Sequence, residues 1–362
     1  MTARKRLLAV DASRMSAQRT GIENYLHHLL PHLCRAWSLV EPGEAEVKVF
    51  APNPAVAAHV FPAPEVVPGG GRGWTQLRLR PALRRMGASV LFNPIPVLPL
   101  IGGLPCPAVV TVHDLHEFRP RWWYFQRLLR RSLGQASRIV CVSLSTREEL
   151  VEEFPAIAPK CIVVREAANL EVFHPGPAGD VLDRLGIREA PLLAVGTVQP
   201  RKNYGRLIEA YSRLGPEAPP LVIVGKPGWA YEETLTMPAR LGLAERVHFA
   251  GHLDEGEVGD LMRASVALCA VSTAEGFGLP VLEAMCCGLP VLASDIPPFR
   301  EVAGTAARFV APGSVDDIAA GLAVVLGDGE GRKRMSDAGL ARRSLFSWER
   351  AAADIVGVLA EA

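Results

Sequence analysis

The sequence lacks any apolar run of the roughly 18–20 residues that a bilayer-spanning helix needs. Its first apolar stretch, Leu7–Val10, is too short for a signal peptide and is typical of a buried strand. The seven cysteines contain no Cys-x-x-Cys pair, so the commonest zinc and redox spacings are missing. These absences predict a protein of the reducing cytoplasm.

A strong net charge is also missing, because 39 Lys and Arg are balanced by 38 Asp and Glu. With no nucleic-acid motif either, we do not expect nucleic acid as a partner. The balance hides an asymmetry, since residues 1–175 carry 21 basic and 14 acidic side chains and the rest carries 18 and 24. The first half is therefore the better candidate for contact with an anionic surface.

Finally, no Gly-x-Gly-x-x-Gly opens the first predicted helix with an acidic residue about 20 positions later, which argues against a nicotinamide dehydrogenase. What the chain does have is 49% apolar and 21% charged residues, as a folded globular protein has. Its 362 residues are enough for two domains, each large enough for a core of its own.

Short apolar runs alternate with longer amphipathic stretches, which is the pattern of parallel α/β sheets. Two sets of six runs are too many for one ordinary open sheet and predict an α/β fold of two doubly wound domains. The runs are Leu7–Val10, Val47–Ala51, Val90–Phe92, Ala108–Val112, Ile139–Val142 and Cys161–Val164, then Leu192–Gly196, Leu221–Val224, Val247–Ala250, Val266–Ala270, Pro290–Ala293 and Ala307–Val310. The Pro- and Gly-rich segment His174–Asp180 is the predicted linker, and Pro62–Gly73 is a predicted loop.

The segment Glu275-Gly-Phe-Gly-Leu-Pro-Val-Leu-Glu283 reads as a glycine turn followed by a helix, with Pro280 in the first helical turn and Gly288 at the end. Backbone N–H groups at such a helix start can bind phosphate. The two carboxylates can accept hydrogen bonds from different sugar hydroxyl groups. Alternatively, both only balance the helix dipole on a solvated face.

A second segment, Pro200-Arg-Lys-Asn203, follows a predicted strand and places Arg201 and Lys202 at the carboxyl end of the sheet, where α/β proteins bind ligands. Arginine can bind phosphate oxygens in pairs and lysine adds a point charge. Taken alone, two basic residues in a turn are more often solvated surface.

Together, Pro200–Asn203 and Glu275–Met285 closely resemble the retaining glycosyltransferases of family four, which have the GT-B fold of two Rossmann-like domains facing across a cleft. The resemblance covers residues 190–325 and extends more loosely through Thr111–Leu115, Val140–Ser143 and Phe346–Glu349. It implies an acceptor-binding domain over 1–175, a nucleotide-sugar-binding domain over 176–345, and a C-terminal helix over 346–362 that packs back on the first domain.

The resemblance also implies roles for individual residues. Arg201 and Lys202 match the pair that holds and stabilises the departing diphosphate, and Glu283 matches the carboxylate that binds the ribose. Glu275 matches the residue that contacts the transferred sugar. The backbone contacts that match are Gly276, Phe277, Gly278 and Leu279, and Gly21 lies in what resembles the family's first loop.

His113 matches a histidine near the sugar or acceptor, and without the resemblance it could equally be a satisfied structural residue. His113 and His116 do not form a convincing metal pair, because no third ligand is suggested nearby. After the strand ending at Val164, the family's usual Asn-Gly turn is replaced by Glu166-Ala-Ala-Asn169.

Two stretches, Arg72–Arg85 and Arg119–Arg131, each hold five arginines and no acidic residue. The second adds four aromatic residues, a composition that favours an anionic membrane interface. The alternative is that both are solvated helix faces with their aromatic residues packed inward.

The resemblance therefore predicts a retaining hexosyltransferase that needs no metal and no bound cofactor. The expected donor is a nucleotide diphosphate sugar, GDP-mannose first and a UDP-sugar second. The expected acceptor is a hydroxyl group, first of a lipid-linked saccharide in surface polysaccharide or glycolipid synthesis at the inner face of the membrane. The alternatives are a soluble acceptor, a sugar-nucleotide epimerase or phosphorylase on a similar fold, and a non-catalytic binding protein.

Overall fold

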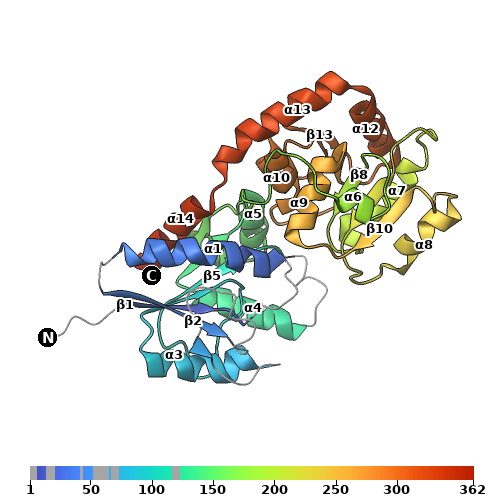
Figure 1. The fold of residues 1–362 in the computed structure, drawn as a ribbon. Coiled ribbons are helices and arrows are strands. Elements are labelled where there is room, and N and C mark those ends of the chain that lie inside the picture. Colours follow the sequence, from blue (N-terminus) through green and yellow to red (C-terminus); the bar gives the residue numbers. More distant parts are fainter. Residues whose placement is uncertain (1–5, 14–20, 41–43, 52–64, 67–72, 116–122) are drawn as a thin grey trace. The chain divides into compact units, whose positions relative to one another are not determined.

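The structure, a computed structural model, describes residues 6–13, 21–40, 44–51, 65–66, 73–115 and 123–362 (Figure 1). The chain divides into two compact units. Unit 1 comprises Met1–Glu166 and Ser347–Ala362, and unit 2 comprises Ala167–Phe346. The chain leaves unit 1 at Glu166, before the boundary expected at residue 175.

Unit 1 is built on a parallel sheet, which has seven strands in the part that the structure describes. In spatial order they are β3 (Glu65–Val66), β2 (Ala45–Ala51), β1 (Arg6–Asp11), β4 (Val90–Asn93), β5 (Ala108–Val112), β6 (Arg138–Cys141) and β7 (Cys161–Val163). Six of these match predicted runs. The exception is β3, which pairs with the end of β2 inside the segment predicted to be a loop; residues 62–64 and 67–72 of that segment lie outside the described residues.

The helices of unit 1 connect these strands and cover the sheet. They are α1 (Gly21–Ser38), the π-helical turn η1 (Thr75–Leu79), α3 (Arg80–Met86), α4 (Trp123–Gln135), α5 (Leu144–Glu153), the 3₁₀ turn η2 (Pro155–Lys160) and α14 (Trp348–Ala360). Apolar residues of η1, α3, α4, α5 and η2 pack with the strands in one continuous core.

The last helix, α14, belongs to unit 1 and packs on α1 (Figure 1). Ser347 caps its start by accepting a hydrogen bond from the backbone N–H of Arg350. The Trp348 ring meets the Tyr25 ring of α1 edge-on, with 5.7 Å between centroids. The Arg6 side chain donates to the carbonyl of Ala360 at 3.3 Å, which joins the end of α14 to β1.

Unit 2, whose residues are all described, is a second parallel sheet of six strands. In spatial order they are β10 (Val247–Gly251), β9 (Leu221–Val224), β8 (Leu192–Val195), β11 (Ala267–Ala270), β12 (Val291–Ser294) and β13 (Ala307–Val310). All six match predicted runs. The prediction of an α/β fold with two doubly wound sheets is confirmed.

Eight α-helices and two 3₁₀ turns complete unit 2. They are α6 (Val181–Arg184), η3 (Pro200–Lys202), α7 (Tyr204–Tyr211), α8 (Glu232–Arg240), α9 (Glu255–Ala264), α10 (Leu279–Cys287), α11 (Pro297–Ala303), α12 (Val315–Gly327), α13 (Gly329–Arg342) and η4 (Arg343–Leu345). The predicted linker His174–Asp180 lies inside unit 2. Arg263 of α9 donates hydrogen bonds to the carbonyls of His174 and Pro177 in this segment. The Pro- and Gly-rich segment is therefore a loop held against unit 2 and not a linker between the units.

Candidate functional site

The strand order of unit 2 reverses beside β8, which has β9 on one side and β11 on the other. In open α/β sheets, ligands bind outside the carboxyl ends of the strands at such a switch point. The Arg201-Lys202 pair lies in η3, within the loop after β8, and Glu275 lies in the loop after β11. The topology alone therefore brings the two motifs to the same edge of the sheet.

At this edge Glu275 forms ion pairs with both basic residues. One carboxylate oxygen, Oε1, accepts from Lys202 Nζ at 2.7 Å, and Oε2 accepts from Arg201 Nη1. Arg201 Nη1 also donates to the carbonyl of Ala274 at 2.8 Å. We refer to Arg201, Lys202 and Glu275 as the ionic cluster.

The ionic cluster is nearly sealed from solvent, since the Lys202 and Glu275 side chains are 11% and 10% exposed. Burial by itself would raise the pKa of Glu275, but the charges of Lys202 and Arg201 and hydrogen bonds from Lys202 and Ser272 lower it to about 2. Glu275 is therefore ionised at neutral pH, and the cluster carries one net positive charge, as a site for an anion requires.

The loop after β8 is shaped to hold Lys202 in place. Gly196 has φ +141°, and a Cβ added there would lie 2.6 Å from Lys202 Cε, so the lysine stem fills the space that a side chain would need. Asn203 ends the 3₁₀ turn in the left-handed conformation with φ 61°. Its side chain donates to the carbonyls of Val271 and Pro312 at 3.0 and 2.8 Å, which fixes the loop to the segments after β11 and β13.

The glycine turn before α10 forms as predicted. Gly278 is the N-cap residue with φ 111°, Pro280 lies in the first turn, and Gly288 ends the helix in the left-handed conformation. A Cβ at Gly278 would lie 2.8 Å from Phe299 Cδ1. Glycine is therefore required at this position both by conformation and by space.

The other predicted residues of this segment also lie on unit 2. Phe277 is buried, with its ring 5.8 Å from that of Phe346, so its side chain packs in the interior of unit 2. Gly276 is buried before the helix and Leu279 begins it. Glu283 is half-buried, one turn further along α10 than Leu279.

Two of the predicted site residues, His113 and Gly21, belong to unit 1. Gly21 is exposed at the start of α1, and a Cβ there would meet no atom of the described residues within 4 Å. Its neighbour Thr20 lies outside the described residues, as does His116.

His113 follows β5 directly, and both of its ring nitrogens are engaged. Nδ1 lies 2.9 Å from Glu166 Oε1, and Nε2 lies 3.0 Å from the carbonyl oxygen of Pro94. Because a carbonyl only accepts, the hydrogen bond to Pro94 requires the hydrogen on Nε2. The Tyr25 ring packs edge-on against the imidazole at 4.7 Å.

Sequence reasoning missed two of these contributors. Glu166 was noted for replacing the family's Asn-Gly turn, but nothing in the pattern pairs it with a histidine 53 residues earlier. Asn203 belongs to the segment Pro200–Asn203, in which the sequence pattern predicted a function only for Arg201 and Lys202. Asparagine tolerates the left-handed conformation better than most residues, and its place in a tight turn after a strand could have indicated its structural role.

The arginine-rich stretches are only partly described, because Arg72, Arg119 and Arg121 lie outside the described residues. Arg78, Arg84 and Arg85 are exposed. Arg130 of α4 lies over the Phe154 ring at 5.6 Å, which is a structural contact within unit 1. Among the helices that the structure describes, none is both long and apolar enough to cross a bilayer.

Comparison with known proteins gives two family matches along the chain. Residues 19–172 match the model described as Glycosyltransferase Family 4, and residues 186–342 match Glycosyl transferases group 1. The O-antigen chain mannosyltransferase B of Escherichia coli is 32% identical over 67% of this chain and 67% of its own length. The MMP alpha-(1->4)-mannosyltransferase of Mycolicibacterium hassiacum is 29% identical. The matched region covers 67% of this chain and 58% of that relative.

Among solved structures, Anabaena Alr3699/HepE in complex with UDP and glucose matches with a TM-score of 0.80 and 19% identity, over 99% of this chain and all of that chain. At this identity the likeness concerns the fold, which is that of the GT-B glycosyltransferases. The resemblance predicted from the two motifs is confirmed: this chain belongs to the family 4 glycosyltransferases.

Proposed function

We propose that the protein transfers mannose from a nucleotide diphosphate sugar to a hydroxyl group of a growing surface polysaccharide. The observation that carries this proposal is the ionic cluster at the switch point of unit 2, a buried cationic site fixed by Asn203 beside a glycine turn. The names of the bacterial relatives, which are O-antigen and other mannosyltransferases, support mannose and the polysaccharide. GDP-mannose is the proposed donor and a UDP-sugar the second candidate.

In this proposal Arg201 and Lys202 bind the donor diphosphate and stabilise the charge that develops on it as it leaves. Glu275 orients the two cations and contacts the transferred sugar, and Glu283 binds the ribose hydroxyls. The backbone from Gly276 to Leu279 lies at the start of α10, where N–H groups favour an anionic ligand.

The proposed reaction proceeds with retention at the anomeric carbon and without a metal ion. The acceptor oxygen bonds to the anomeric carbon on the face from which the bond to the diphosphate oxygen breaks, and the acceptor proton passes to the departing phosphate. Arg201 and Lys202 would then supply the positive charge for which other transferases use a divalent cation.

We assign the acceptor to unit 1, with His113 as the residue nearest the reacting groups. Since both ring nitrogens are engaged, His113 would exchange its bond with the Pro94 carbonyl for one with a substrate oxygen. Glu166 would act as a positioning residue, because its contact with Nδ1 fixes the plane of the imidazole ring. A lipid-linked saccharide is the first candidate acceptor, which would place the protein at an anionic membrane surface.

The test is saturation-transfer NMR of the purified protein with GDP-mannose, UDP-glucose and related donors, repeated on Glu283→Ala. Transfer to one donor that is lost in the variant supports the proposal and identifies the sugar. Binding to no donor would refute it. Product analysis by NMR reports retention or inversion, and turnover with excess chelator tests metal independence.

A further inference from the structure

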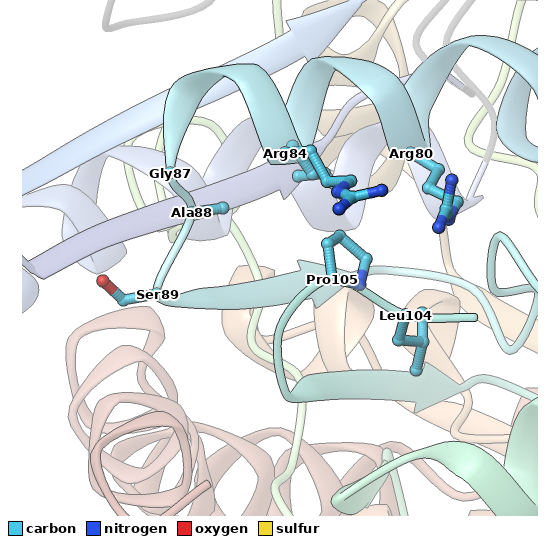
Figure 2. A pocket seen from close by; sticks show the side chains of 8 residues that line it. Arg80, Arg84, Gly87, Ala88, Ser89, Leu104 and Pro105 are labelled. Carbon is cyan, nitrogen blue, oxygen red and sulfur yellow. The ribbon is translucent and has the colours of Figure 1, made fainter. Parts of the chain in front are cut away.

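A cavity of about 480 Å³ opens on unit 1 between α3 and the segment before β5 (Figure 2). Figure 2 shows Arg80 and Arg84, one helical turn apart, projecting from α3 toward Leu104 and Pro105. Ser89 lies at one end of the cavity. None of its eight lining residues is acidic.

The cavity is distinct from the candidate active site. Ser89 precedes β4 and Pro105 precedes β5, so both lie at the amino edge of the parallel sheet. His113 follows β5 and therefore lies at the opposite, carboxyl edge. A group bound in the cavity would not occupy the position proposed for the acceptor.

Its two arginines are available to an anion. Arg80 donates from Nε and Nη2 to the carbonyls of Gly103 and Gly102, which fixes its guanidinium and leaves three of its five N–H groups. Arg84 is exposed, and within the described residues its guanidinium has no hydrogen-bond or ion-pair partner. Two guanidinium groups on one helix face match the oxygens of a phosphate ester.

Two exposed aliphatic side chains lie in the segments next to Arg80 and the Gly102–Gly103 loop that it holds. Leu77 and Ile101 are 62% and 59% exposed, although both are large aliphatic residues. The Gln76 side chain joins their two segments, because its Oε1 accepts from the backbone N–H groups of Leu100 and Ile101 at 2.8 and 3.4 Å. Exposed aliphatic residues beside arginines are typical of a surface that enters the headgroup region of a bilayer.

We propose that this cavity binds the phosphate of an anionic phospholipid headgroup, with Arg80 and Arg84 as the phosphate ligands and Leu77 and Ile101 inserted among the acyl chains. The combination favours a lipid over a free phosphate ester, because a soluble ligand gives no role to the two exposed aliphatic side chains. The inference rests on the proposed function in one respect, since a lipid-linked acceptor would require the protein to be at a membrane.

The test is sedimentation of the full chain with vesicles of phosphatidylcholine alone and of phosphatidylcholine with an equal part of phosphatidylglycerol. Arg84→Glu is compared with Arg85→Glu, which makes the same charge change on the same helix turn but does not line the cavity. One charge near an anionic surface changes affinity about fivefold, so reversal at Arg84 should weaken binding by about tenfold or more. Arg85→Glu removes the same general attraction to the surface but no cavity ligand, so it should weaken binding severalfold less than Arg84→Glu does.

Equal losses in the two variants would overturn the cavity as the site and leave a diffuse basic surface. No binding of the parent protein to the anionic vesicles would also overturn the proposal. If Leu77→Ser binds the vesicles as the parent does, while glycerol phosphate binds the parent and not Arg84→Glu, the site takes a soluble phosphate ester and the lipid assignment is wrong. Donor binding measured by NMR on the same samples tests the proposed function separately, because Arg84 has no part in it.

Discussion

Removing the charge of Glu275 tests the physical basis of the ionic cluster. The pKa of Glu275 is about 2 in the folded protein against an ordinary 4.5. That difference corresponds to about 3 kcal/mol of folding stability at neutral pH. Because the folded pKa is the lower one, this stability is fully present above about pH 4.5 and is lost as the pH falls toward 2. Glu275→Gln should therefore destabilise unit 2 by about 3 kcal/mol at pH 7.

The same linkage makes the effect depend on pH. At pH 3 the parent protein has lost part of the contribution itself, so the difference from Glu275→Gln should fall to roughly half its neutral value. The unfolding of each unit can be followed separately in urea by the methyl NMR signals of buried Ile223 in unit 2 and Ile139 in unit 1. The Ile139 signals should be unaffected by the substitution.

A matched control is Glu209→Gln, which removes a carboxylate that is half-exposed and pairs with Arg213 at 3.7 Å. Such a surface pair contributes less than about 1 kcal/mol, so this variant should unfold nearly as the parent does. A destabilisation by Glu275→Gln below about 1 kcal/mol at pH 7, or one that does not change with pH, would refute the reasoning. A nucleoside diphosphate should restore part of the lost stability if its phosphates bind the same two cations.

Three further predictions concern the residues around the site. Lys202→Ala should lower turnover by about 10²-fold, since it removes a charge that stabilises the leaving group, and near-parental rates in a steady-state assay would contradict that role. Asn203→Ala should lower the unfolding free energy of unit 2 by about 2 kcal/mol, because it removes the donor to the buried carbonyl of Val271 and the partly buried carbonyl of Pro312; an unchanged urea midpoint would contradict this. Glu166→Gln should reduce transfer and alter its pH profile while leaving donor affinity unchanged, whereas a loss of donor affinity would count against a positioning role on unit 1.

The main-chain architecture could be predicted because it depends on local pattern. Every apolar run proposed as a strand forms one, since a parallel strand covered on both faces must be apolar along its length. The bounds of α10 follow from Pro280 and Gly288, whose backbone restrictions act within one turn. By contrast β3 has two residues, Glu65 and Val66, which carry no readable periodicity.

The side-chain pairings could be predicted less well, because they depend on contacts between residues distant in sequence. Lys202 and Glu275 are 73 residues apart, and composition gives no means of pairing them. The strand order places them at the same edge of the sheet, and the resemblance pointed to both without showing that they bind each other. The unit boundary was misplaced for a similar reason, since the anchoring of His174–Asp180 by Arg263 depends on tertiary contacts.

The placement of α14 has a consequence for how the chain is made. Unit 2 is, in effect, inserted within unit 1, whose last helix is encoded after all of Ala167–Phe346. During synthesis on the ribosome, unit 2 can complete its core before α14 has been made. Until then α1 lacks its packing partner, which begins at Trp348. The domain that is synthesised first is thus the one that finishes folding last. Removal of the last sixteen residues, Ser347–Ala362, would therefore destabilise unit 1. It would leave unit 2 intact, although unit 2 directly precedes the removed segment.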